Sequence, residues 1–192
     1  MEKIISSIFK AYDIRGIVAT QLTPQTTELI GQVLGSIAIE NQVKGLVVGY
    51  DGRLTSPLLA NSLIKGILST GCNVFEIGEV TTPMVYFANY ELKTYSGVMI
   101  TGSHNPPEYN GLKMVMAGET LSGEKIQQIY QRILDKQVVT GNGTRYREDI
   151  LEAYLNKITS DVKLDRRMSI VVDAGNGVAG KIAPQLYRRM GC

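Results

Sequence analysis

The sequence has no tryptophan, only three phenylalanines, one histidine and two cysteines among its 192 residues. One histidine and two distant cysteines, Cys72 and Cys192, cannot build a zinc site, and they provide no disulfide framework. Cys72 lies in an apolar run, which is typical of a small buried residue. These cysteines indicate a reducing compartment.

Long apolar runs and a strong net charge are also missing. No stretch approaches the roughly 18 apolar residues that a membrane span requires, and the first ten residues lack the apolar core and cleavage site of a signal peptide. The formal net charge is only +2, too small to indicate nucleic acid or an anionic membrane as a partner. We therefore expect a cytoplasmic protein with no nucleic-acid partner and no membrane partner.

The chain contains enough apolar residues for a hydrophobic core. Hydrophobic residues make up 44% of the sequence and charged residues 20%, which excludes a disordered chain or a collagen-like repeat. A length of 192 residues suggests one ordinary domain with a remainder, or two small domains.

Helix and strand signals alternate from residue 24 onward. Short continuous apolar runs predict strands buried on both faces, and Thr-Pro or Ser-Pro pairs predict helix starts. The alternation predicts an α/β fold with a mixed, mostly parallel sheet between helix layers, since the strand at 111–116 follows its predecessor after only a loop. The predicted strands are 45–50, 72–77, 96–101 and 111–116, and the predicted helices are 24–41, 56–71, 84–92 and 123–136.

A second unit begins after a break at residues 141–143. A helix is predicted at 147–160 and a buried strand at 167–173, and a glycine-rich turn then leads into a helix that runs to Met190. A parallel strand and its crossover helix need a further strand to return to. We therefore predict an N-terminal α/β domain at 1–140, and at 141–192 a linker helix with the first βα unit of a second, similar, truncated domain.

The strand expected at 168–173 would expose apolar edges if it had no sheet to join. We expect residues from about 155 onward to be mobile, or to pair with a second copy of the chain.

The stretch from Thr101 to Gly111 is the densest group of unusual residues. It reads Thr-Gly-Ser-His-Asn-Pro-Pro-Glu-Tyr-Asn-Gly and follows an apolar strand, so it lies at the strand end where open α/β sheets bind ligands. A serine on a stiff loop, here Ser103 beside His104, can serve as a nucleophile or a phosphate carrier. The alternative is a loop made only of turn-forming residues.

Basic residues are predicted near the same strand ends. Lys10 and Arg15 flank a short acidic and apolar segment, Arg53 directly follows the strand at 45–50, and Lys113 comes just after the Ser103 loop. Cations that converge on a strand-end loop suit a phosphate or a phosphosugar. Scattered surface charge is the alternative for any one of them.

The turn from Gly175 to Gly180 offers a different function. It fits G-x-G-x-x-G between a predicted strand and a predicted helix, which would make the chain a nucleotide-binding α/β module. A Walker A loop fails at Ile182, where Mg²⁺ coordination needs serine or threonine, and the acidic residue of a dinucleotide site would fall beyond residue 192. Any tight strand-to-helix turn can also show this pattern.

Five segments of the chain form a recognisable set. They are Lys10–Gly16 (KAYDIRG), Gly49–Arg53 (GYDGR), Thr101–Pro106 (TGSHNP), Tyr109–Lys113 (YNGLK) and Val171–Gly177 (VVDAGNG). Together they resemble the α-D-phosphohexomutases, and among them the bacterial phosphomannomutase/phosphoglucomutases. The likeness extends over nearly the whole chain, with the segments in the family's order.

The resemblance implies an intramolecular phosphotransferase that interconverts hexose 1-phosphate and hexose 6-phosphate. Ser103 would carry the phosphoryl group and form a hexose 1,6-bisphosphate intermediate. Arg15 and Lys113 would assist proton transfer and stabilise charge, and His104 would orient the phosphoserine or its acceptor.

The same resemblance implies two substrate-side residues and a metal. Tyr12 would contact the phosphosugar, and Arg53 would be a supporting cation there. Mg²⁺ would be bound by the phosphate on Ser103 and by three carboxylates of a D-G-D-x-D-R loop in the family's second domain.

Three family loops do not occur in these 192 residues. They are the D-G-D-x-D-R loop, the sugar-selecting loop of the third domain and the phosphate-clamping loop of the fourth domain. We therefore expect an N-terminal fragment that is inactive or nearly so by itself. Without the sugar-selecting loop, the sequence does not specify glucose or mannose.

Overall fold

The computed structural model describes residues 4–192, and within them one mixed β-sheet organises the molecule. The strands lie in the order β1-β5-β4-β2-β3-β7, with β6 beside β5. Strands β4, β2, β3 and β7 run parallel to one another, whereas β5 runs antiparallel to β1, β4 and β6. The strand bounds are β1 Ile14–Ile17, β2 Leu46–Tyr50, β3 Val74–Glu79, β4 Gly97–Ile100, β5 Tyr109–Met116, β6 Glu119–Thr120 and β7 Arg145–Arg147.

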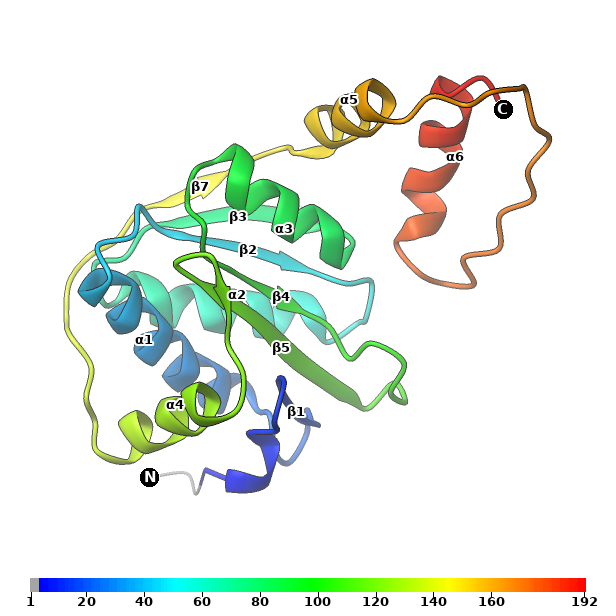
Figure 1. Cartoon of the computed structure of the whole chain (residues 1–192). Coiled ribbons are helices and arrows are strands. Elements are labelled where there is room, and N and C mark those ends of the chain that lie inside the picture. The colour runs from blue at the N-terminus through cyan, green and yellow to red at the C-terminus, as the bar shows by residue number, and fades with distance from the viewer. Residues whose placement is uncertain (1–3) are drawn as a thin grey trace.

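Helices cover both faces of this sheet (Figure 1). One apolar core joins the sheet to α1, α2 and α4, and a second core joins its other face to α3 and to the C-terminal helices α5 and α6. The predicted α/β architecture with a mixed sheet between helix layers is therefore confirmed. The helix bounds are η1 Ser6–Ile8, α1 Pro24–Glu40, α2 Ser56–Leu68, α3 Thr82–Glu91, α4 Glu124–Leu134, α5 Leu151–Asp161 and α6 Ala179–Arg189.

The proline-containing pairs start helices as predicted. At α1, the Thr23 hydroxyl accepts a hydrogen bond from the backbone N–H of Thr26 at 3.1 Å, and Pro24 occupies the first helical turn. Such a cap satisfies a backbone donor that the helix itself leaves without a partner, and the fixed φ of proline suits that position. Prolines stand in the first turns of α2 and α3 as well.

Besides the two-residue β6, the short strands β1 and β7 are absent from the sequence-based prediction. The Arg-Tyr-Arg segment of β7 is exposed at all three residues and pairs in parallel with β3. Neither strand contains a continuous apolar run, so each is recognised only by its pairing with a neighbouring strand, β1 with β5 and β7 with β3. Strand β7 extends the sheet past residue 140, and the domain division at that residue stays a prediction.

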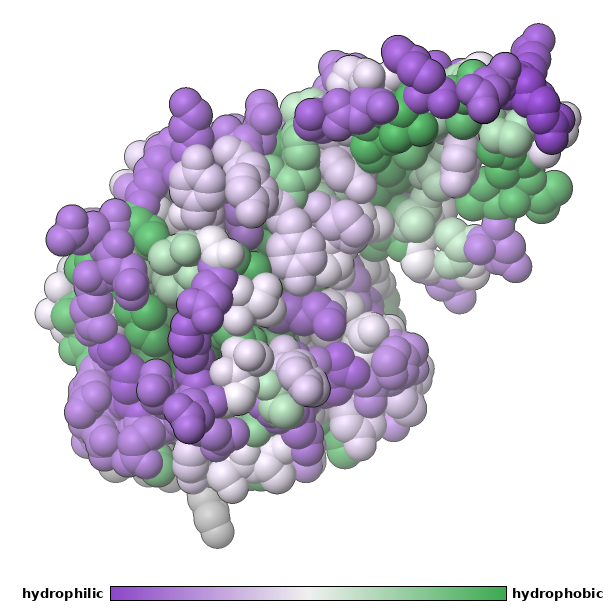
Figure 2. Space-filling model, viewed as in Figure 1, coloured by the Kyte–Doolittle hydropathy of each residue, from purple (hydrophilic) through white to green (hydrophobic). Residues whose placement is uncertain are grey.

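The strand predicted at 167–173 is wrong. These residues have no strand assignment and form no ladder with any part of the chain that the structure describes. An apolar run becomes a strand only where a neighbouring strand completes its backbone hydrogen bonds. Val171 is 98% exposed, and Figure 2 shows apolar surface gathered around this C-terminal part of the chain.

The glycine-rich turn and α6 nevertheless contact the rest of the fold. Val178 and Ile182 are each 8% exposed and pack into the core formed around α3. The Lys181 ammonium lies 2.6 Å from the Glu79 carboxylate at the end of β3. The turn before α6 therefore lies at the carboxyl end of the sheet (Figure 1).

The structure bears on the predicted burial of Cys72 and on the membrane-spanning potential of the helices. Cys72 is 1% exposed, and burial raises the pKa of its thiol to about 11, so it is a core residue as predicted. Among residues 4–192, no helix combines the length and the apolar character that crossing a membrane demands.

Candidate functional site

Ser103 lies in the loop between β4 and β5, at the carboxyl end of the parallel strands. Its side chain is exposed, and its backbone has a left-handed φ of +53°. The hydroxyl of Thr101 accepts a hydrogen bond from the Ser103 N–H at 2.9 Å, and the Ser103 Oγ lies 3.3 Å from Nδ1 of His104. A non-glycine residue with positive φ is uncommon and is held there by its surroundings. The loop therefore presents the serine hydroxyl to solvent in a fixed orientation.

Arg53 lies behind this loop and binds its backbone. One terminal nitrogen donates to the carbonyl oxygens of Pro106 and Tyr109, at 2.7 and 3.0 Å. The other donates to those of Ser103 and Asn105, at 3.0 and 2.6 Å. Each terminal nitrogen of a guanidinium carries two hydrogens, so all four of these N–H groups have backbone acceptors. The structure thus brings Arg53 to the Ser103 loop, but with its terminal donors engaged by the protein.

Asp51 organises the neighbouring backbone, and the sequence analysis did not select it. Its carboxylate accepts hydrogen bonds from the Arg53 N–H at 3.1 Å, the Ser56 hydroxyl at 2.6 Å and the Gly102 N–H at 3.3 Å. It also lies 3.5 Å from Nε of Arg53. Charge-assisted bonds of this kind are the strong ones. Asp51 therefore links the end of β2, the start of α2 and the Ser103 loop.

Asn110 is a second residue that the sequence analysis did not select. It is fully buried at the start of β5, and its amide nitrogen donates to the hydroxyls of Thr55 and Ser56, at 3.0 and 2.9 Å. Its side-chain oxygen accepts from the N–H of Gly111 at 2.9 Å. A buried polar group needs such partners. The available sequence signal was a polar side chain directly before the strand predicted at 111–116.

Arg15 connects β1 to the Ser103 loop. One terminal nitrogen of its guanidinium donates to the side-chain oxygen of Asn105, and the other is paired with Asp13. The side chain is only 17% exposed. The predicted proximity of Arg15 to the serine loop is therefore present in the structure, through Asn105.

Lys113 lies on the same sheet face as Arg15. In the β1–β5 pair Arg15 stands opposite Gly111, and Lys113 is two residues further along β5. Side chains two residues apart share a face, and diagonal neighbours across an antiparallel pair are about 7–8 Å apart. Lys113 is half-buried, so two of the predicted cations lie on one side of the sheet, next to the Ser103 loop.

Tyr12 and Lys10 lie in the turn before β1 and point outward. The Tyr12 ring is 80% exposed, and Lys10 is exposed as well. Backbone pairing between Phe9 and Ile14 closes the turn, and the Lys10 N–H donates to the Asp13 carbonyl at 2.9 Å. An exposed ring on a closed turn is available for a ligand contact.

The side chains of residues 4–192 do not form a metal site. Among residues 4–192, no group of three or more histidine, cysteine, aspartate or glutamate side chains is placed to hold a metal ion. The two carboxylates beside the loop, Asp13 and Asp51, are each paired with an arginine. The described residues therefore do not fit a carboxylate cage for Mg²⁺.

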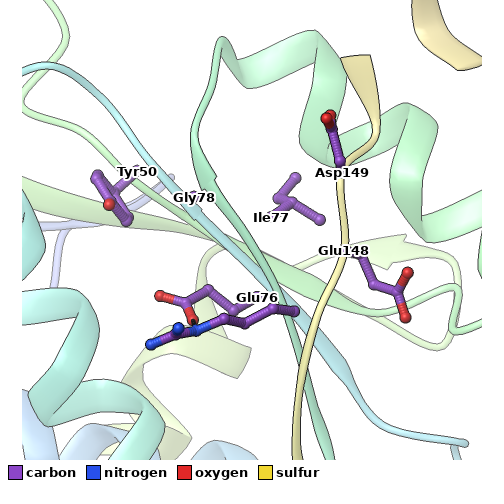
Figure 3. A pocket seen from close by; sticks show the side chains of 7 residues that line it. Tyr50, Glu76, Ile77, Gly78, Glu148 and Asp149 are labelled. Atoms are coloured by element: carbon purple, nitrogen blue, oxygen red, sulfur yellow. Dashed lines mark ion pairs between the residues drawn. The ribbon is translucent and has the colours of Figure 1, made fainter. Parts of the chain in front are cut away.

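A separate hollow of about 570 Å³ lies at the β3–β7 edge of the sheet. Its acidic residues are Glu76, Glu148 and Asp149. The Glu76 carboxylate is already paired with Arg145 at 2.7 Å and with Arg147 at 3.5 Å. Figure 3 shows that Glu148 and Asp149 point away from Glu76, so the three carboxylates do not converge on one ligand.

Three N–H groups of the turn at 175–180 already have acceptors close by in the chain. Its N–H groups at Gly175, Gly177 and Gly180 donate to Asp173 Oδ1, the Ala174 carbonyl and the Gly177 carbonyl, at 2.8, 2.9 and 3.0 Å. Nucleotide binding by a glycine-rich turn depends on free N–H groups at a helix start. The three glycine N–H groups of the motif are therefore not free to bind a nucleotide phosphate.

Comparisons with known proteins identify the family of this chain. The family model described as phosphoglucomutase/phosphomannomutase, alpha/beta/alpha domain I, matches residues 6–140. A Pseudomonas aeruginosa protein named phosphomannomutase/phosphoglucomutase is 48% identical over 187 residues, which are 97% of this chain and 40% of that protein. A Neisseria meningitidis phosphoglucomutase is 45% identical over 194 residues, which cover 100% of this chain and 42% of that protein.

A solved structure shows the same fold. The crystal structure of a phosphoglucomutase/phosphomannomutase family protein from Burkholderia thailandensis superposes with a TM-score of 0.94 at 40% identity, over 99% of this chain and 43% of that one. The chain thus spans about two fifths of the length of the relatives that it matches. It belongs to the phosphoglucomutase/phosphomannomutase family and contains the first α/β/α domain of that family.

Proposed function

We propose that this chain is the phosphoserine-bearing part of an enzyme that interconverts hexose 1-phosphate and hexose 6-phosphate, with glucose, mannose or both as the sugar. The observation that carries the proposal is the Ser103 hydroxyl, exposed on a loop whose backbone is bound by Arg53 and Asp51. A phosphoryl carrier needs an accessible oxygen and a fixed approach direction.

The proposed reaction has two transfers. In the first, the bond between phosphorus and the Ser103 Oγ breaks and the Oγ gains a proton, while the phosphorus bonds to the free hydroxyl oxygen of the hexose phosphate, which loses its proton. The product is hexose 1,6-bisphosphate, which reorients in the site. In the second, the other phosphoryl group returns to the Ser103 Oγ, which loses its proton, and the sugar oxygen that the phosphoryl group leaves gains a proton. Such transfers depend mainly on positioning and on charge neutralisation.

The surrounding residues have complementary roles in this proposal. Arg15 and Lys113, on one sheet face beside the loop, stabilise the transferred charge and assist the proton movements. His104, with Nδ1 3.3 Å from the Ser103 Oγ, orients the phosphoserine. Tyr12 contacts the sugar from its exposed turn.

Mg²⁺ would supply further neutralisation of phosphate charge in the whole enzyme. The side chains of residues 4–192 do not form a cage for it, so the phosphate on Ser103 would be its contact with this part of the chain. No step above depends on the metal.

The proposal is tested by comparing the 192-residue chain with the full-length enzyme of which we propose it to be part. With hexose 1-phosphate, Mg²⁺ and a trace of hexose 1,6-bisphosphate, the full-length enzyme is expected to form hexose 6-phosphate, and the isolated chain little or none. Peptide mass spectrometry is expected to find the phosphate on Ser103. A full-length enzyme without turnover, or with its phosphate on another residue, would contradict the proposal.

We also propose that the unpaired segment at 168–173 pairs with a second copy when the 192-residue chain is studied alone. Ile170 and Val172 are each 40% exposed and Val171 is 98% exposed, and an extended apolar segment without a ladder is prone to pair. Sedimentation velocity is expected to show a concentration-dependent dimer, which the double substitution Ile170→Lys and Val172→Lys shifts to monomer. A chain that stays monomeric at about millimolar concentration, where even weak contacts associate, would contradict this pairing.

A further inference from the structure

We propose that Arg53 is a positioning residue that holds the Ser103 loop through its backbone, and not a cation that binds the substrate phosphate. The inference rests on the proposed phosphoserine function and assigns Arg53 a specific part in it. Its basis is the number and direction of the contacts made by one guanidinium group, together with the absence of a side chain at Gly102.

The acceptors of Arg53 lie along the whole loop. The carbonyl oxygens of Ser103, Asn105, Pro106 and Tyr109 all receive hydrogen bonds from its terminal nitrogens, at 2.6–3.0 Å. A planar guanidinium can reach four acceptors at once because its donors point outward in a fixed fork. One of these acceptors is the carbonyl of the proposed phosphoserine itself.

Asp51 holds Arg53 from the other side. Its Oδ2 lies 3.5 Å from Nε of Arg53 and accepts from the N–H of Gly102 at 3.3 Å. The Arg53 side chain is 16% exposed, so both its charge and its direction are held inside the protein. A guanidinium enclosed in this way cannot turn toward a phosphate without releasing the loop.

Gly102 leaves the space that the guanidinium occupies. A Cβ added at Gly102 would lie 2.8 Å from Nη1 of Arg53 and still closer to its Cζ and Nε, well inside the usual carbon contact distance of about 3.5–4 Å. Alanine at Gly102 would therefore force the guanidinium to move, although Gly102 itself has no positive φ. The Arg53 guanidinium can bind the loop in this position only because residue 102 has no Cβ.

The test uses Arg53→Lys in the full-length enzyme. A lysine keeps the positive charge but has one nitrogen with three donors, so it cannot serve four carbonyls. We expect kcat to fall about 10–100-fold, the usual cost of misplacing a reacting group by about 1 Å, while KM for hexose 1-phosphate changes less than about threefold. Gly102→Ala is expected to lower kcat by a similar factor. In the double variant, Gly102→Ala with Arg53→Lys, the fold-decrease in kcat is expected to be smaller than the product of the two single fold-decreases.

A second measurement is made on the 192-residue chain. The N–H groups of Ser103, Asn105 and Tyr109 form hydrogen bonds within the loop, and Arg53→Lys is expected to speed their hydrogen exchange by about tenfold or more. Arg132→Lys is the matched control, because Arg132 also forks between the Glu40 carboxylate and the Gln137 carbonyl, but in a different part of the fold. It is expected to leave kcat and the exchange of the loop unchanged.

Two results would overturn the positioning role. One is a normal kcat with a raised KM in Arg53→Lys, which would make Arg53 a phosphate-binding cation. The other is unchanged exchange at all three loop amides. Neither depends on Ser103 being the phosphate carrier, since that proposal fails separately if Ser103→Ala keeps its turnover.

Discussion

Replacing Ser103 by alanine in the full-length enzyme is expected to abolish phosphoryl transfer. The hydroxyl oxygen at this position is the atom that the proposed reaction phosphorylates, and the neighbouring His104, with Nδ1 3.3 Å from that oxygen, has only an orienting role in the proposal. Removing a covalent nucleophile typically costs on the order of 10⁴-fold or more in kcat. The measurement is the rate at which hexose 1-phosphate becomes hexose 6-phosphate, with substrate binding followed separately by calorimetry.

Two further serine variants make this result specific. Ser122→Ala removes an exposed hydroxyl before α4 and is expected to keep normal turnover. Ser103→Gly is expected to be as inactive as Ser103→Ala but more stable than the native protein by about 0.5–1 kcal/mol, because glycine adopts a positive φ without strain. Turnover within about tenfold of native in Ser103→Ala, a loss too small for a missing nucleophile, would refute the assignment.

Gly66→Ala is expected to have the largest effect on stability. Helices α1 and α2 cross with their backbones in contact, so a Cβ at Gly66 would lie 2.9 Å from the Gln32 nitrogen and closer still to the Glu28 carbonyl oxygen. The neighbours are backbone atoms that cannot rotate away, and the helices would have to separate. We expect a loss of about 3 kcal/mol or more, and a melting temperature about 6–12 °C lower.

The matched control for this substitution is Gly180→Ala. Gly180 also lies in a helix, but a Cβ there would be 3.5 Å from the Cβ of Ala174, an ordinary contact. Alanine favours helix over glycine by about 0.5–1 kcal/mol, so this variant is expected to be neutral or slightly stabilised. Thermal denaturation followed by circular dichroism compares the two, and equal melting temperatures would show that the α1–α2 crossing is not close-packed.

The local patterns of the sequence predicted most of the secondary structure. The start of α1 at Thr23-Pro24 and the buried run of β2 depend on residues within a few positions of one another, and both are where the sequence places them. The run at 167–173 also contains consecutive apolar residues, at 170–172, but forms no strand. The difference is in the neighbours, because β2 lies between β3 and β4, whereas the C-terminal run has no ladder among the described residues.

Some residues of the candidate site could be selected from the sequence, and others could be found only in the structure. The sequence alone was enough to predict Ser103 at a strand end and to select Arg15 and Lys113 as candidate cations, because these predictions depend on where the strands stop. It also indicated the family, because that depends on the order of the motifs. From the sequence, Arg53 was interpreted as a substrate-side cation, and Asp51 and Asn110 were not selected.

The tertiary structure decided the surroundings of those three residues. The carbonyl acceptors of Arg53 lie 50 to 56 positions further along the chain, and the hydroxyls that bind Asn110 lie 54 and 55 positions before it. No local period records a contact at such separations, because strand order brings the β2, β4 and β5 ends together only after the sheet has formed. The residue types and their strand-end positions are therefore determined by the sequence, whereas their hydrogen-bond partners are determined by the order of the strands.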